Sequence, residues 1–169
     1  MIMEEKTLFE ATVVYPIRDD GYVLLAKKTI KIGAGCWNGY GGGREGDESL
    51  TKTAVRELQE ESGLTAREED LEKIGLLRSY NHKSDGQVVF GEVHFYTAKN
   101  CSGDVQETEE MITPTWFALA KLPLDELMPA DKLWIPDALG GKKLIVTVHY
   151  GPFQREILQP VEIKEVSEF

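Results

Sequence analysis

Apolar residues recur at helical spacing over one stretch of the chain and predict an amphipathic helix that packs one stripe inward. The stripe consists of Leu50, Ala54, Val55 and Leu58. Asp47, Glu48 and Ser49 come immediately before it and supply side chains suited to a helix start. Gly63 follows the stripe and suits a left-handed C-cap, so we expect the helix to end there.

Runs rich in β-branched and aromatic residues, bounded by turn residues, predict strands on both sides of this helix. The runs cover residues 8–17, 22–26, 74–80, 88–98, 115–118, 144–149 and 156–163. We expect a hairpin around Arg18–Gly21, a loop over 29–40, and a terminal hairpin around Gly151–Pro152. A second helix is expected from about Asp131 to Leu139. This order of elements predicts a mixed α/β domain.

Composition is that of an ordinary soluble globular chain, with 169 residues, 41% hydrophobic and 28% charged. We expect a single domain over residues 1–169. The net charge of −10 argues against a long nucleic acid as ligand, since a basic stripe is missing from the sequence. A small phosphorylated substrate stays possible, because bound cations can reverse the local field.

Targeting signals are missing from the sequence. The two cysteines, Cys36 and Cys101, are far apart and not in metal-ligand spacing, which favours a reducing compartment. The first residues do not resemble a signal peptide, and apolar runs fall short of the roughly 20 residues that span a bilayer. We therefore predict a cytoplasmic protein without membrane contact. The sequence gives no basis for an oligomeric state.

Three glutamates, Glu57, Glu60 and Glu61, lie on another face of the first predicted helix, at i, i+3 and i+4. An acidic face of this kind is most often only solvated, although each like-charge pair destabilises an isolated helix by about 0.2–0.5 kcal/mol. The glycine-rich loop before the helix changes this interpretation, because its backbone groups can approach an anion or a metal. Carboxylate oxygens are ligands that Mg²⁺ prefers, and Mg²⁺ shares its other positions with substrate phosphates.

The same stretch carries a recognisable motif. Gly42, Glu48, the run Arg56–Glu61 and the pair Gly63–Leu64 stand at the spacing of a complete Nudix box over residues 42–64. The chain thus resembles the Nudix hydrolases. The resemblance implies an α/β/α sandwich with a central mixed β-sheet, in which the box forms a loop–helix–loop catalytic motif.

Similarity beyond the box points to one group within that family. Residues 33–42, 110–117 and 132–136 resemble the enzymes that hydrolyse oxidised purine nucleoside triphosphates such as 8-oxo-dGTP. The implied reaction releases a nucleoside monophosphate and pyrophosphate, with Mg²⁺ or Mn²⁺ as cofactor. It would serve to clear oxidised nucleotides from the pool used for DNA synthesis.

The resemblance also assigns roles at the metal. Glu57, Glu60 and Glu61 would be ligands together with the Gly41 carbonyl, and Glu110, or Glu109 if the loop is shifted, would be a more distant carboxylate. Which glutamate acts as general base is left open. The catalytic set also includes Arg56 and Glu48, which would form an ion pair that orients the box.

Candidate substrate-binding residues are spread along the chain: Thr12, Lys28, Asn38, Gly42, Tyr80, Met128 and Asp131. The Asn38 amide can donate to and accept from a base edge, whereas Lys28 suits either a phosphate contact or a solvated strand end. The base site departs from the pattern that it resembles. Met128 stands where a stacking Trp is expected, Ala130 replaces one Asp of a pair, and Gly43 replaces a Lys.

Two alternatives stay open. The substrate could be another nucleoside diphosphate derivative, such as a dinucleoside polyphosphate, a nucleotide sugar or ADP-ribose. Tyr80 weakly favours the dinucleotide, although a strand Tyr is more often packed. A catalytically silent nucleotide-binding domain is a different class, and the intact glutamates argue against it. A triad around a histidine is not indicated by the sequence, so hydrolysis would use an activated water.

Overall fold

Two β-sheets organise the chain in the computed structural model, which describes residue 5 and residues 7–169. The larger is a mixed sheet of six strands in the order β4-β1-β6-β5-β8-β9, and the smaller has the order β3-β2-β7. The strands are β1 (Glu10–Pro16), β2 (Tyr22–Lys28), β3 (Trp37–Asn38), β4 (Tyr40–Gly43), β5 (Leu71–His82), β6 (Val88–Ala98), β7 (Met111–Ala118), β8 (Lys143–Tyr150) and β9 (Glu162–Val166).

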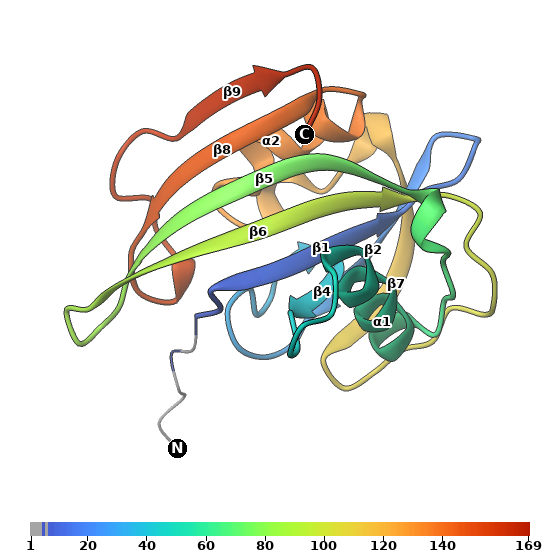
Figure 1. Cartoon of the computed structure of the whole chain (residues 1–169), viewed down its shortest axis with the longest axis horizontal. Helices are drawn as coiled ribbons and strands as arrows, with labels where there is room; N and C mark the ends of the chain where they lie inside the picture. The colour runs from blue at the N-terminus through green and yellow to red at the C-terminus, as the bar shows by residue number, and fades with distance from the viewer. Residues whose placement is uncertain (1–4, 6) are drawn as a thin grey trace.

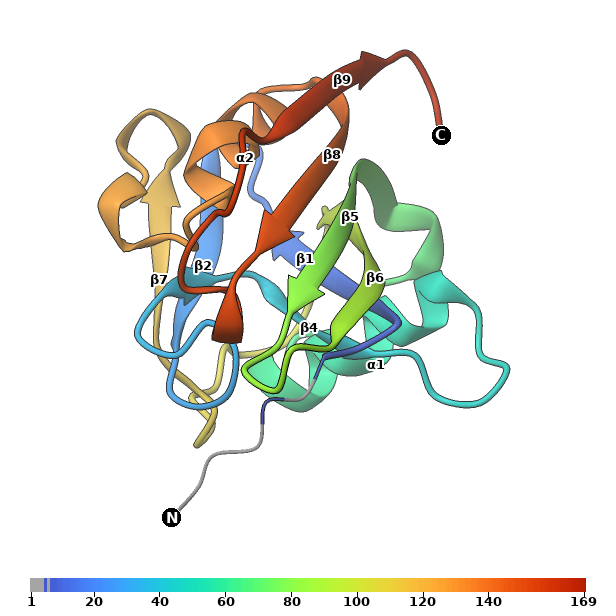
Figure 2. The same ribbon diagram turned by 90° about the vertical axis from the view of Figure 1, so that its left-hand side faces the viewer.

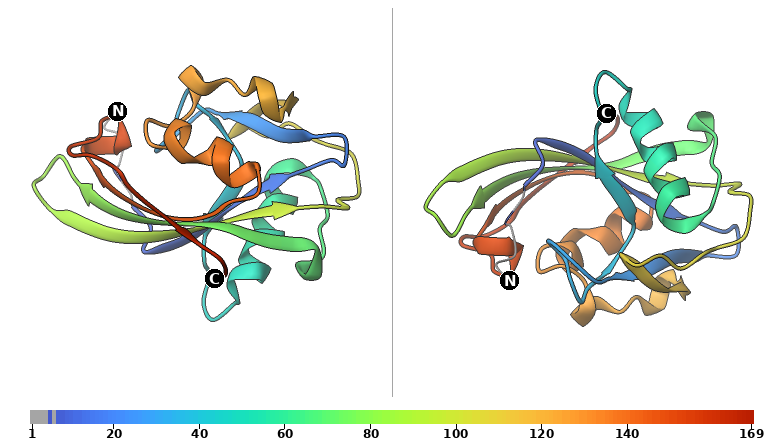
Figure 3. Two further views of the ribbon diagram at one scale, coloured as in Figure 1. Left: turned by 90° about the horizontal axis from the view of Figure 1, so that it is seen from above. Right: turned by 90° about the horizontal axis from the view of Figure 1, so that it is seen from below.

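The two α-helices cover opposite faces of the six-stranded sheet (Figures 1 and 3). Helix α1 (Leu50–Ser62) packs its apolar stripe on one face, where Ala54 and Leu58 are fully buried. Helix α2 (Asp131–Leu139) lies on the other face beside the smaller sheet, and buries Trp134 against Phe95 of β6. The expected α/β/α arrangement around a mixed sheet is therefore confirmed.

Helix α1 begins and ends as its sequence predicts. The Ser49 hydroxyl accepts a hydrogen bond from the Lys52 N–H at 3.2 Å, which caps the first turn. Gly63 adopts the left-handed conformation with φ of 78° and donates its N–H to the Gln59 carbonyl. These two caps fix which residues of the acidic face lie over the sheet edge.

The first expected hairpin is wrong. Strands β1 and β2 are joined by a tight turn, but they separate after the bridge between Ile17 and Val23 and enter different sheets. Strand β1 pairs instead with β4 and β6, both distant in sequence. Local turn chemistry predicts the reversal of the chain, whereas the separation depends on partners that the turn does not specify.

The extents of other elements also differ. The stretch 37–43, mostly expected as loop, holds β3 and β4, whose glycines obscure the strand pattern. The last strand is Glu162–Val166 rather than 156–163, because a short 3₁₀ helix, Pro152–Gln154, lengthens the connection from β8. Among the described residues, no helix is long and apolar enough to cross a bilayer.

We expect Ser49→Ala to lower the free energy of unfolding by about 1 kcal/mol, because the first turn of α1 would lose its side-chain cap. Urea unfolding followed by circular dichroism measures the change. Ser49→Thr keeps the hydroxyl and is the matched control. An equal loss in both variants would show that the cap contributes nothing.

Candidate active site

The acidic face of α1 rests against strand β4 at two glycines. The Gly41 N–H donates a hydrogen bond to Glu61 Oε1 at 2.8 Å. A Cβ atom at Gly42 would lie 2.5 Å from Glu57 Oε1, and one at Gly41 would collide with the Thr12 carbonyl oxygen. A side chain at Gly42 would shift the Glu57 carboxylate, and one at Gly41 would disturb the pairing of β4 with β1. The glycine pair therefore sets the position of the glutamates.

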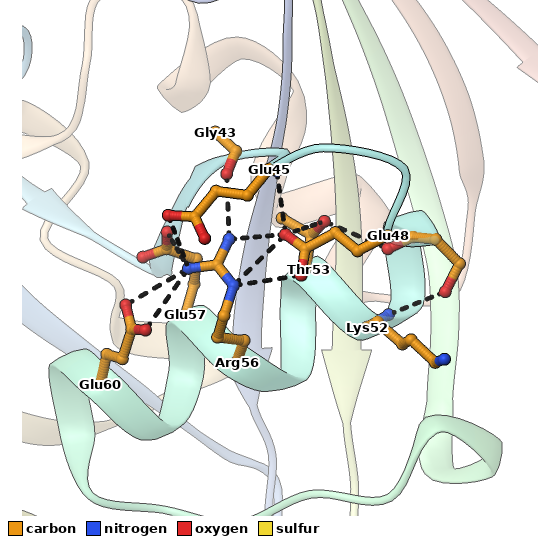
Figure 4. A network of polar contacts seen from close by, with 9 residues as sticks. Gly43, Glu45, Glu48, Lys52, Thr53, Arg56, Glu57 and Glu60 are labelled. Carbon is orange, nitrogen blue, oxygen red and sulfur yellow. Dashed lines mark hydrogen bonds and ion pairs between the residues drawn. The ribbon is translucent and has the colours of Figure 1, made fainter.

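One guanidinium binds several of the carboxylates around α1 (Figure 4). Arg56 donates to Glu48 at 2.6 Å, to Glu57 at 2.9 Å and to Glu60 at 3.3 Å. It also donates to the Gly43 carbonyl at 3.1 Å. Hydrogen bonding from Arg56 lowers the pKa of Glu48 to about 2. The expected ion pair between Arg56 and Glu48 is present, and it ties the loop after β4 to the helix.

Glu61 and Glu57 carry negative charge in a poorly solvated place. Burial, and then the neighbouring charge of Glu57, raise the pKa of Glu61 to about 7. Burial also raises the pKa of Glu57, against the opposing effect of Arg56. Carboxylates whose pKa is raised in this way lack sufficient positive charge around them. A bound cation would supply it.

A second segment brings Glu110 to the same region. The Thr29 hydroxyl donates to the Glu109 carbonyl at 2.6 Å, and the Thr29 N–H donates to the Glu110 carbonyl at 3.0 Å. Lys31 lies 3.6 Å from the Glu110 carboxylate. Lys28, whose pKa burial lowers, faces both Glu61 and Glu110. The loop after β2 and the loop before β7 thus meet beside α1.

These groups open into one cavity of about 880 Å³. Its carboxylate end, as we call it, is lined by the expected metal-site residues Gly41, Glu57, Glu60, Glu61 and Glu110. The expected substrate-binding residues Thr12, Lys28, Asn38, Gly42, Met128 and Asp131 line the same cavity. Arg56 and Glu48 do not line the cavity, and Arg56 is connected to it by its hydrogen bonds to Glu57 and Glu60.

Asn38, Met128 and Asp131 form what we call the base end of the cavity. Asn38 and Met128 flank Gly33, since a Cβ there would lie 3.2 Å from both Asn38 Nδ2 and Met128 Sδ. Asp131 is 7% exposed, and burial raises its pKa to about 7. At neutral pH a large share of this carboxyl is protonated and can donate a hydrogen bond.

Tyr80 is not brought to the cavity, and this expectation is corrected. Alternation along β5 turns Ser79 and Asn81 toward the cavity and Tyr80 to the opposite face. There Tyr80 stacks on His149, with ring centroids 4.6 Å apart. The structure also adds residues that the sequence did not suggest, Asn81 and Gln154 among them. The period of β5 could have indicated Asn81, whereas Gln154 had no sequence signal.

Comparison with known proteins agrees with this geometry. A model of the NUDIX domain matches residues 7–138. The chain belongs to the Nudix family. Two oxidized purine nucleoside triphosphate hydrolases are similar to it: the zebrafish protein (Danio rerio) is 38% identical and covers 83% of each chain, and the mouse protein (Mus musculus) is 35% identical and covers 87% of this chain and 89% of its own.

A solved Nudix structure supports the fold as well. The mutator MutT protein from Bacillus halodurans superposes with a TM-score of 0.73 at 25% identity, and the match covers 91% of this chain and 96% of that one. Because the match covers this large a share of the chain, the fold class stated above holds for nearly all of it.

The donor set fits the divalent cation that Nudix hydrolases generally need. Its members are carboxylates and backbone oxygens, which suit hard cations. Among the described residues, no group of three or more acidic, histidine or cysteine side chains lies close enough together to hold a metal ion. Glu57 and Glu60 bind Arg56, and Glu61 binds the Gly41 N–H. Thr12 Oγ1, buried beside them, has no hydrogen-bond partner among the described residues.

We expect Asp131 to make stability fall with rising pH. Its pKa is about 7 in the folded chain and near 3.8 when unfolded, so its contribution is full below pH 4 and is lost as the pH rises through 7. Asp131→Asn should therefore be more stabilising at pH 8 than at pH 5, by up to about 2.7 kcal/mol, because about two units of the pKa difference lie between pH 5 and pH 7 at 1.36 kcal/mol per unit.

Urea unfolding at the two pH values measures this difference. Asp137→Asn, on the exposed side of α2, is the matched control and should behave alike at both. A pH-independent effect of Asp131→Asn would contradict the raised pKa.

Proposed function

We propose that this Nudix hydrolase cleaves oxidised purine nucleoside triphosphates to the monophosphate and pyrophosphate. The main observation in support is that one cavity joins the carboxylate end to the base end. A triphosphate can reach Glu57 and Glu61 while its base meets Asn38 and Asp131. The names of the zebrafish and mouse relatives support the same substrate class.

Glu57, Glu60, Glu61, Glu110 and the Gly41 carbonyl would hold Mg²⁺. When bound, Mg²⁺ would neutralise phosphate charge and lower the pKa of the attacking water. The chain's own residues orient the site. Arg56 and Glu48 hold the helix against the loop after β4, and Lys28 directs a positive charge at the bound phosphates.

Base recognition rests on three side chains. The Asn38 amide offers a donor and an acceptor to a base edge, and protonated Asp131 offers another donor. Met128 packs on the purine face in place of an aromatic ring. Because Tyr80 lies on the other face of the sheet, the residue that favoured a dinucleoside polyphosphate gives no support to that alternative.

The Nudix domain, we infer, extends through residue 169, since β8 and β9 complete the six-stranded sheet. Two free cysteines support a cytoplasmic location. The protein would act on free nucleotides, in keeping with its charge of −10.

We expect purified protein with Mg²⁺ to hydrolyse 8-oxo-dGTP with a higher kcat/KM than dGTP, 2-oxo-dATP, ADP-ribose or a dinucleoside tetraphosphate. Glu61→Gln should lower kcat by more than about 100-fold. Substituting a residue that only supports a metal ligand already costs up to about 100-fold, and Glu61 is itself an expected ligand. Chromatographic measurement of monophosphate and pyrophosphate gives both results.

Glu69→Gln, at an exposed glutamate outside the cavity, is the matched control and should retain full activity. Preference for ADP-ribose or the dinucleotide would overturn the substrate assignment and leave Nudix chemistry in place. Nucleotide binding without turnover on the whole panel would instead indicate the silent domain.

A further inference from the structure

The cavity is also lined by a group of uncharged polar side chains. Ser79 and Asn81 project from β5, and Gln154 projects from the 3₁₀ turn after β8. We call these three residues the polar wall. Tyr150, which stands opposite Asn81 in the register of β8 with β5, also lines the cavity beside them. Neither the metal site nor the Asn38 contact uses the polar wall.

Hydrogen bonds fix how the Asn81 amide is turned. Its Nδ2 lies 3.1 Å from the Val89 carbonyl oxygen and 3.0 Å from Ser79 Oγ. A carbonyl oxygen only accepts, so Nδ2 must face it and Oδ1 must face the other way. Asn81 is 4% exposed, and both of its N–H groups are engaged. Its orientation is therefore set by the strands and not by a ligand.

That orientation in turn fixes Gln154. Asn81 Oδ1 accepts a hydrogen bond from Gln154 Nε2 at 2.6 Å. The second N–H of Gln154 and its carbonyl oxygen have no hydrogen-bond partner among the described residues. A half-buried amide that lines the cavity thus keeps one donor and one acceptor for a ligand.

The turn that carries Gln154 is held in an uncommon conformation. Phe153 and Gln154 have φ of 59° and 57°, in the left-handed region that few non-glycine residues adopt. The Glu5 carboxylate accepts from the Phe153 N–H at 2.8 Å and from the Ser84 N–H and hydroxyl at 2.9 and 2.8 Å. The turn thereby lies beside the β5–β6 connection (Figure 2). Strained residues persist only where the surroundings hold them.

We propose that Gln154 is a specificity-determining residue, and that its amide pairs with a donor–acceptor edge of the purine base. Asn81 positions that amide. The proposal deepens the proposed function and rests on it. A carboxamide with adjacent donor and acceptor matches a base edge carrying a carbonyl next to an N–H. Gln154 thus supplies polar recognition at the far side of the base, beyond Asp131.

Gln154→Met keeps the length of the side chain and removes the amide. We expect kcat/KM for 8-oxo-dGTP to fall about tenfold or more, the effect of a lost hydrogen bond to a buried polar group, mainly through KM. The value for dCTP, a pyrimidine reference, should stay unchanged. The ratio of the two values is the readout, because damage to the fold or the metal site lowers both.

Gln159→Met, in the exposed part of the same connection, is the matched control and should leave the ratio unchanged. Gln154→Asn is the second variant, because Asn tolerates the left-handed backbone but draws the amide back by one methylene. It should also lower the ratio. An unchanged ratio in both Gln154 variants overturns the proposal while the proposed function stands. Absence of wild-type turnover of both nucleotides overturns both together.

Discussion

Close approach between α1 and β4 is the constraint on which the site depends. A side chain at Gly42 would displace Glu57, and one at Gly41 would collide with β1. Because the helix lies this close, Glu61 reaches the Gly41 N–H and becomes half-buried. The repulsion created by crowding glutamates on one helix face is offset in part by Arg56, and the remainder makes the site suited to a cation.

The net charge of −10 would be expected to repel a polyanionic substrate, but the distribution of charge around the cavity reduces this conflict. The excess negative charge at the cavity is concentrated at the carboxylate end, where a divalent cation would reverse the local field. Lys28 is half-buried and its charge interacts with those of Glu61 and Glu110, so this lysine offers positive charge to the site. The base end adds Asp131, whose pKa burial raises to about 7, so a large share of this carboxyl carries no charge at neutral pH. Charge is therefore separated along the cavity.

The sequence predicted what local chemistry controls. The limits of α1 followed from Ser49 and Gly63, and the ion pair of Arg56 with Glu48 followed from the Nudix box. Features decided by distant partners were not predictable. Strand β1 leaves its turn neighbour for β4 and β6, and Tyr80 faces away because of the strand register. Neither outcome is encoded in the flanking residues alone.

The cavity is lined in part by residues beyond the range that the family model matches. The NUDIX match ends at residue 138, whereas Tyr150 and Gln154 line the cavity from β8 and the turn after it. The base end lacks the stacking Trp and the paired Asp of the pattern that it resembles, and has Met128 and Ala130 instead. A polar wall opposite these positions can supply hydrogen bonds that they do not. On the function proposed above, the box residues would supply the chemistry, and the C-terminal segment would help to determine which base is bound.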